Sequence, residues 1–211
     1  MFRPKEIRRV LRSHATPTPS GALERLREGA DRFSKGDGLS RAGREQLARL
    51  AQSQAPFAVV LGCSDSRVAP ELIFNCDLGE LFVVRLAGNT VDDSALGSIL
   101  YGVCVLGAPL VVVLGHARCG AVDAAVRIVT EGATFPEAMN GVLTPLAPAV
   151  DRALKSGAED VVAAAVHENV SSVVGRLSTR QPLLSERLAD GRLEIVGAYY
   201  DLLTGHVEFF T

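Results

Sequence analysis

The sequence has 211 residues, of which 47% are hydrophobic, and it carries a formal net charge of −2. This length supports one compact domain with a sizeable core, and a second independent domain is not expected. The small net charge gives no general attraction to nucleic acid or to an anionic membrane. Because no run of about 18 apolar residues occurs, we expect no segment that spans a bilayer.

Residues 1–21 differ in composition from the rest of the chain. Residues 3–12 hold five Arg or Lys residues and one acid, and residues 16–21 read Thr-Pro-Thr-Pro-Ser-Gly. The basic run fits a nucleic-acid-binding arm or a short solvated helix, and we favour the helix. The Pro-rich piece predicts a linker. Since the segment lacks the apolar stretch of a secretory signal, we expect a cytoplasmic protein, with a single domain over residues 22–211.

After the linker, helices are predicted first and strands follow. Apolar residues at helical spacing predict helices over 22–33 and 41–53. Short apolar runs rich in β-branched residues then predict strands that are buried on both faces. These runs are 57–62, 81–84, 110–115 and 193–199.

Helical stretches separate these strands, which is the pattern of a parallel sheet. The stretches are 94–106, 121–131 and 158–177. A Thr-Gly turn within 202–209 predicts an antiparallel edge strand at the end of the chain. The fold class is therefore α/β, with about four parallel strands, an antiparallel edge strand and flanking helices.

Reactive side chains follow three of the predicted strands. Cys63-Ser64-Asp65-Ser66-Arg67 follows the first, Arg85 and Gly88-Asn89 follow the second, and residues 115–120 (Gly-His-Ala-Arg-Cys-Gly) follow the third. In open α/β sheets, ligands bind beyond the carboxyl ends of the strands. Parallel strands therefore bring all three groups to one edge of the sheet.

The residue types in these groups favour zinc. His116 and Cys119 are three residues apart across a strand-to-helix turn, and Cys63 occupies the matching place on another strand. Imidazole and thiolate are good zinc ligands, and two thiolates neutralise a dication. Three protein ligands leave a fourth position for water or for Asp65.

The remaining candidates have plainer interpretations beside the functional ones. Asp65 and Arg67 form either a surface ion pair or a switch, in which Asp65 binds zinc in a closed state and Arg67 in an open one. Cys76 and Cys104 have no reactive neighbours in the sequence, so we interpret both as structural thiols. In a chain of this length without a secretory signal, all four cysteines are expected to be reduced.

Two motifs resemble those of β-class carbonic anhydrases. They are Cys63-Ser64-Asp65-Ser66-Arg67-Val68 and the Gly-His-x-x-Cys-Gly-Ala-Val motif at residues 115–122. Residues 26–33, 82–89 and 193–205 are similar to further segments of that family, so the resemblance covers most of the chain.

The resemblance implies zinc-dependent, reversible hydration of carbon dioxide to bicarbonate and a proton, through attack by zinc-bound hydroxide. It implies one Zn²⁺ per chain on Cys63, His116 and Cys119, with Asp65 as the fourth ligand in the closed state. Asp65, Arg67 and Gln54 would be catalytic, and Phe82, Tyr101 and Gly120 would form the substrate pocket. It also implies a homodimer or homotetramer in which N-terminal helices pack on the partner and Gln54 reaches the pocket across the dimer interface.

Other functions remain open or are disfavoured by the motifs. The same site could hydrolyse carbonyl sulfide or carbon disulfide, or it could hold a structural zinc with Asp65 as a permanent fourth ligand. The chain has no Cys-x-x-Cys redox motif and no glycine-rich phosphate loop. We therefore expect a zinc lyase that acts on a small molecule, with neither nucleic acid nor membrane as a partner.

Overall fold

The computed structural model describes residues 17–37, 47–48 and 50–210. The predicted basic helix at 3–12 and most of the predicted helix at 41–53 lie outside these residues. The described strands are β1 (Ala58–Gly62), β2 (Leu81–Arg85), β3 (Leu110–His116), β4 (Glu194–Tyr200) and β5 (Val207–Phe210). They form one five-stranded sheet in the order β2-β1-β3-β4-β5.

The sheet confirms the predicted topology. Strands β2, β1, β3 and β4 are parallel to their neighbours, and β5 pairs antiparallel with β4 at one edge. Every residue of β1 and of β3 is buried, as their continuous apolar sequences predicted. These two buried interior strands therefore hold the residues that follow them in defined positions.

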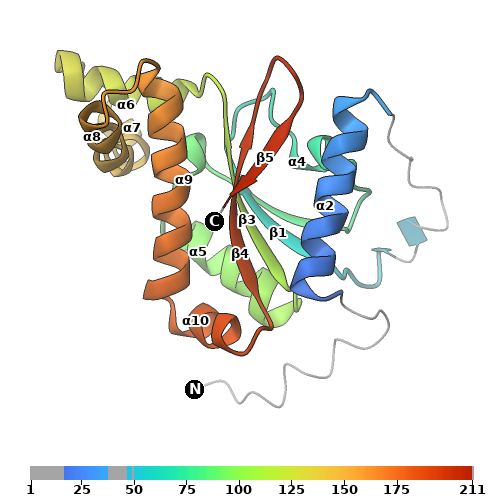
Figure 1. Ribbon diagram of the computed structural model, residues 1–211. Helices are drawn as coiled ribbons and strands as arrows, with labels where there is room; N and C mark the ends of the chain where they lie inside the picture. The colour runs from blue at the N-terminus through green and yellow to red at the C-terminus, as the bar shows by residue number, and fades with distance from the viewer. Residues whose placement is uncertain (1–16, 38–46, 49, 211) are drawn as a thin grey trace.

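Helices cover both faces of the sheet. The helical segments are α2 (Pro19–Ser34), α4 (Pro70–Ile73), η1 (Ala87–Asn89), α5 (Asp93–Leu100), η2 (Tyr101–Val105), α6 (Gly120–Glu131), α7 (Glu137–Leu143), η3 (Thr144–Leu146), α8 (Ala147–Lys155), α9 (Val161–Arg180) and α10 (Pro182–Ala189). Figure 1 shows α2 on one side of the sheet and α9 on the other.

Alternate residues of the central strands pack in separate core clusters on the two faces of the sheet. Val60 and Val112 pack in the cluster that contains residues of α2, whereas Val59 and Val111 pack in the cluster that contains residues of α5, α9 and α10. A third cluster joins Cys63 and Cys119 to residues of α6, α8 and α9. The sheet is thus enclosed on both faces, and its reactive edge is included in the packed interior.

Two element boundaries differ from the predictions. Helix α2 begins at Pro19, within the predicted linker, because the Thr18 side chain accepts a hydrogen bond from the Gly21 N–H and proline is favourable in the first helical turn. The predicted helix at 94–106 changes at Tyr101 from an α-helix to a π-helical segment, η2. Among the described helices, none has the combined length and apolarity required to cross a membrane.

Candidate metal centre

The three predicted strand ends meet at one edge of the sheet. In the sheet register, Gly62 of β1 is paired with Arg85 of β2 on one side and with Leu114 of β3 on the other. Cys63 directly follows Gly62, and His116 is the last residue of β3. Parallel pairing therefore places the first cysteine beside the histidine, although 53 positions separate them in the sequence.

Cys63, His116 and Cys119 form a compact group of metal-donor atoms. One donor atom from each residue lies within 4.8 Å of the others, and all three side chains are buried. The two sulfur atoms are 4.0 Å apart and both cysteines are free thiols, so they form no disulfide. Two thiolates bound tetrahedrally at about 2.3 Å from one zinc ion lie about 3.8 Å apart. The observed spacing fits such an ion.

His116 has the free nitrogen that a metal ligand requires. Its Nδ1 lies 2.9 Å from the Ala117 carbonyl oxygen, which can only accept, so Nδ1 carries the proton. Nε2 is then left with a lone pair. This atom is fully buried and has no hydrogen-bond partner in the described part of the chain. An unpaired buried nitrogen is costly, and a metal ion in this position would remove that cost.

The pKa values of the two thiols are shifted in opposite directions. The pKa of Cys63 is lowered to about 4, chiefly because the Cys119 thiol donates a hydrogen bond to it. The pKa of Cys119 is raised, because Cys63 opposes its ionisation and because it is buried. The Gly88 N–H also donates to Cys63 Sγ, at 3.3 Å. The site therefore favours a thiolate at Cys63 even without a cation.

Asp65 is held at the edge of this group by Arg67. Arg67 donates to Oδ1 through Nε at 2.9 Å and to Oδ2 through Nη2 at 2.7 Å. These hydrogen bonds lower the pKa of Asp65 to about 2, against a smaller opposing effect of burial. Oδ2 lies 4.0 Å from His116 Nε2. The carboxylate is therefore ionised and near the donors, in the arrangement predicted for the open state.

Two arginines fix the backbone around the site. Arg85 donates through Nε to the Cys63 carbonyl at 2.9 Å and through Nη2 to the Asp65 carbonyl at 2.7 Å. Arg67 also donates to the Arg118 carbonyl at 3.3 Å. Arg118 has a positive φ of 54°, which is uncommon for a residue other than glycine and often marks functional sites. Arg118 contributes to the site through its backbone carbonyl, and the sequence alone does not indicate such a contribution.

The predicted substrate-pocket residues do not all lie together in this chain. Phe82 and Tyr101 have ring centroids 6.1 Å apart, and Tyr101 is 48% exposed. Phe82 also lines an open depression of about 320 Å³ along β2 and α5, which Arg85 reaches as well. Gln54 is exposed before β1, and within the described residues no hydrogen bond joins it to the metal-donor group.

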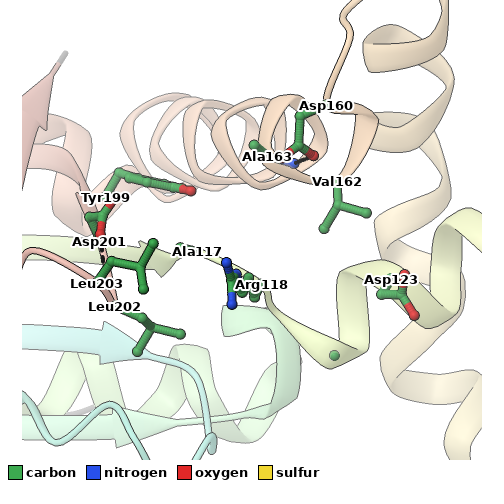
Figure 2. A pocket seen from close by; sticks show the side chains of 11 residues that line it. Ala117, Arg118, Asp123, Asp160, Val162, Ala163, Tyr199, Asp201, Leu202 and Leu203 are labelled. Atoms are coloured by element: carbon green, nitrogen blue, oxygen red, sulfur yellow. Dashed lines mark hydrogen bonds between the residues drawn. The ribbon is translucent and has the colours of Figure 1, made fainter.

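Gly120 lines a different and larger cavity, of about 460 Å³. Figure 2 shows that the Arg118 side chain lies among residues of α9 and of the segment after β4, with Asp123, Asp160 and Tyr199 around it. None of the three donors lines this cavity. The cavity therefore adjoins the His116–Cys119 turn but is separate from the donor group.

The other two cysteines lie outside the site, as predicted. Cys76 is buried and its Sγ donates to the Phe74 carbonyl. Burial raises the pKa of its thiol to about 12. Cys104 is half-buried in η2. Both are free thiols and neither belongs to the donor group.

A family model and several known proteins match this sequence over most of its length. A family model described as carbonic anhydrase matches residues 58–207. A carbonic anhydrase of Mycolicibacterium smegmatis is 40% identical over 191 residues, which cover 90% of this chain and 92% of that protein. Carbonic anhydrase 2 of Mycobacterium tuberculosis is 41% identical over 198 residues, which cover 89% and 90%.

Solved structures agree with the sequence relatives. The β-carbonic anhydrase CcaA superposes with a TM-score of 0.71 at 28% identity, covering 90% of this chain and 87% of that one. The Coccomyxa β-carbonic anhydrase in complex with acetazolamide superposes with a TM-score of 0.68 at 29% identity, covering 90% and 84%. Together with the donor group, these matches show that the chain belongs to the β-carbonic anhydrase family.

Proposed function

We propose that this chain catalyses the reversible hydration of carbon dioxide to bicarbonate and a proton, with Zn²⁺ held by Cys63, His116 and Cys119. The observation that carries the proposal is the buried donor group, in which His116 Nε2 faces no hydrogen-bond partner among the described residues. Two thiolates and one neutral imidazole are a ligand set that zinc favours. Zinc held by these three residues would lower the pKa of a bound water from 15.7 to about 7 and so would supply hydroxide at neutral pH.

Asp65 would hold the reacting water in the correct orientation. Because its pKa is lowered to about 2, it is ionised at every physiological pH and can only accept hydrogen bonds. Arg67 fixes the carboxylate on both oxygens, and the Arg118 carbonyl in turn holds Arg67. A fixed acceptor beside the donor group would select one orientation of the water O–H and would leave an oxygen lone pair free to attack the carbon of carbon dioxide.

The same contacts favour a catalytic site over a purely structural one. A structural zinc needs a closed shell of four protein ligands. Here Arg67 occupies both oxygens of Asp65, and the donor group comprises three residues. This arrangement supports an open fourth position, with Asp65 as the ligand of a closed state when Arg67 releases it.

A dimer would complete the substrate pocket. Carbon dioxide is small and uncharged, so its pocket needs apolar walls rather than charged groups. Phe82 and Tyr101 supply apolar surface beside edge strand β2, and Tyr101 is 48% exposed in the single chain. We propose that a second copy covers this surface and brings its Gln54 amide to the substrate, while Gly120 leaves space at the start of α6. Assembly of the chain into a tetramer and its location in the cytoplasm also remain predictions.

Stopped-flow carbon dioxide hydration combined with zinc analysis tests this function. The purified chain is expected to contain one zinc ion per chain and to hydrate carbon dioxide. Removal of zinc by a chelator should abolish the activity, and added Zn²⁺ should restore it. Full hydration activity in the zinc-free protein would contradict the proposal, as would a zinc-loaded protein that hydrates carbon dioxide no faster than buffer does.

A further inference from the structure

Gly88 provides a contact to the metal-donor group from outside the two ligand-bearing strands. Its N–H donates to Cys63 Sγ at 3.3 Å, and this contact is buried. Gly88 belongs to η1, which follows β2 and precedes α5. Hydrogen bonds to a ligating sulfur set how much negative charge the sulfur gives to a metal, and they orient the ligand. The direction of the Gly88 N–H therefore matters for the site.

The packing around Gly88 leaves it little freedom. Its φ of 66° lies in the left-handed region, where residues with a side chain are strained. A Cβ at this position would lie 2.9 Å from Leu146 Cδ1 and 3.3 Å from Ala121 Cβ. Side chains of η3 and α6 thus bound the glycine on one side, and its polar groups need partners elsewhere.

Asn169 of α9 supplies the partner for the Gly88 carbonyl. Its Nδ2 donates to that oxygen at 2.9 Å, and the residue is only 4% exposed. The two residues are 81 positions apart in the sequence. A buried amide that joins a helix to a loop over this separation is a costly feature unless its hydrogen bond is made.

The helix that carries Asn169 is itself tightly packed against the strand that carries His116. A Cβ at Gly115 would lie 2.7 Å from Val166 Cγ1 and 2.7 Å from Val170 Cγ2, so α9 approaches β3 as closely as only a glycine permits. Val166 and Val170 flank Asn169 in the sequence, and both are buried. The position of the Asn169 amide is therefore fixed relative to β3.

We propose that Asn169 is a positioning residue of the metal centre, which holds the Gly88 carbonyl and so directs the Gly88 N–H at Cys63 Sγ. This inference rests on the proposed zinc site. Asn169 acts through Gly88 and touches neither a metal nor a substrate. Without the Asn169 amide, the Gly88 carbonyl loses its buried donor, and a shift of the Gly88 backbone to find another partner weakens the hydrogen bond to the sulfur. Loss of an outer partner of this kind typically costs about 10- to 100-fold in metal affinity.

The test compares Asn169→Leu with Val173→Ala. The first keeps the branched shape of the side chain and removes the hydrogen-bond donor. The second is a matched control, because Val173 is buried on the same helix, in the core cluster that contains residues of α5 and α10. Its truncation loosens that core without touching Gly88. Asn169→Ala, which removes the side-chain amide without adding bulk, serves if the leucine variant does not fold.

Metal binding is measured by competition with a chelator, and the cobalt(II)-substituted proteins are compared by their sulfur-to-cobalt absorption. We expect Asn169→Leu or Asn169→Ala to bind Zn²⁺ about 10-fold or more weakly than the wild type and to shift the absorption. Val173→Ala should keep the wild-type affinity and spectrum. Wild-type affinity and spectrum in the Asn169 variants, or an equal loss in Val173→Ala, would overturn the positioning role. A wild-type protein that fails to bind zinc would instead refute the proposed function.

Discussion

The Asp65 carboxylate accepts three hydrogen bonds from a single residue, Arg67, through its backbone N–H, Nε and Nη2. At the scale of single residues, this pair distinguishes a site that reacts with water from one that only binds metal. Asp65→Asn keeps the size of the side chain and removes the ionised acceptor. We expect kcat/KM for carbon dioxide hydration to fall by about 100-fold or more, with zinc content unchanged.

A control for this variant exists elsewhere in the chain. Asp190 and Arg192 form a second aspartate–arginine ion pair with the same sequence spacing, at 2.5 Å, and it is exposed. Asp190→Asn should leave kcat/KM and zinc content at the wild-type values. Equal activity of Asp65→Asn and the wild type, measured at equal zinc content, would remove Asp65 from the mechanism.

Cys76 gives a pH dependence of stability that can be isolated from the rest of the molecule. Burial raises the pKa of its thiol from 9.0 to about 12. A raised pKa in the folded state stabilises the fold below about pH 9, and this contribution is lost as the pH rises toward 12. Between pH 9 and 10.5 the loss amounts to about 1.5 kcal/mol.

Urea unfolding of the wild type and of Cys76→Ala measures this contribution, because all other titrating groups are common to both proteins. The difference in unfolding free energy between them should shrink or reverse as the pH rises from 9 to 10.5. A difference that stays constant over this range would show that the thiol ionises equally easily in the folded and unfolded chains.

The site residues that could be predicted from the sequence belong to local sequence patterns. The site residues that could not be predicted belong to no such pattern. Cys63 directly follows β1, His116 ends β3 and Cys119 comes three residues later, so parallel pairing was enough to predict that they meet. Asn169 is one polar residue within a long helix, and its hydrogen bond crosses 81 positions. Arg118 contributes a carbonyl, which every residue has. No local pattern marks either contribution.

At the scale of elements, α9 approaches β3 closely at Gly115. A methyl group at Gly115 would lie 2.7 Å from atoms of both Val166 and Val170. Gly115→Ala should therefore lower the free energy of unfolding by about 1–3 kcal/mol, because the helix must move away from the strand. Urea unfolding followed by far-ultraviolet circular dichroism measures this loss.

Gly175 on the same helix provides a control of opposite sign. A Cβ there would meet nothing within 4 Å, and the residue is exposed within α9. Gly175→Ala should raise the stability by about 0.5–1 kcal/mol, because alanine loses less backbone entropy in a helix. If both variants changed the stability in the same direction and by the same amount, close packing at Gly115 would not be the cause.

Helices and strands could be predicted from the sequence where their burial gives a clear apolar pattern. Strands β1 and β3 are continuous apolar runs, and their predicted bounds differ from the observed ones by a single residue. The change from α5 to η2 at Tyr101 was not predictable. Apolar periodicity averages over several turns, so it does not separate an α-helix from one turn of π-helix.

At the scale of the whole molecule, edge strand β2 lacks a neighbour on one side within the described sheet. Phe82 of β2 is half-buried, Tyr101 next to it is exposed, and Gln54 is exposed before β1. These features are explained if a second copy covers them. Sedimentation equilibrium should give a dimer or a tetramer, and Gln54→Ala should reduce kcat/KM while the mass and zinc content stay the same. A monomer with full activity would contradict this assembly.

The central claim is that activity depends on metal held by this donor group. The most direct measurement is stopped-flow carbon dioxide hydration, with zinc content determined on the same samples of wild type, Cys63→Ala and Cys76→Ala. Cys63 belongs to the donor group, whereas Cys76 is an equally buried thiol outside it. Cys63→Ala should lose zinc and activity together, and Cys76→Ala should keep both. A Cys63→Ala protein that hydrates carbon dioxide at the wild-type rate without zinc would contradict the claim.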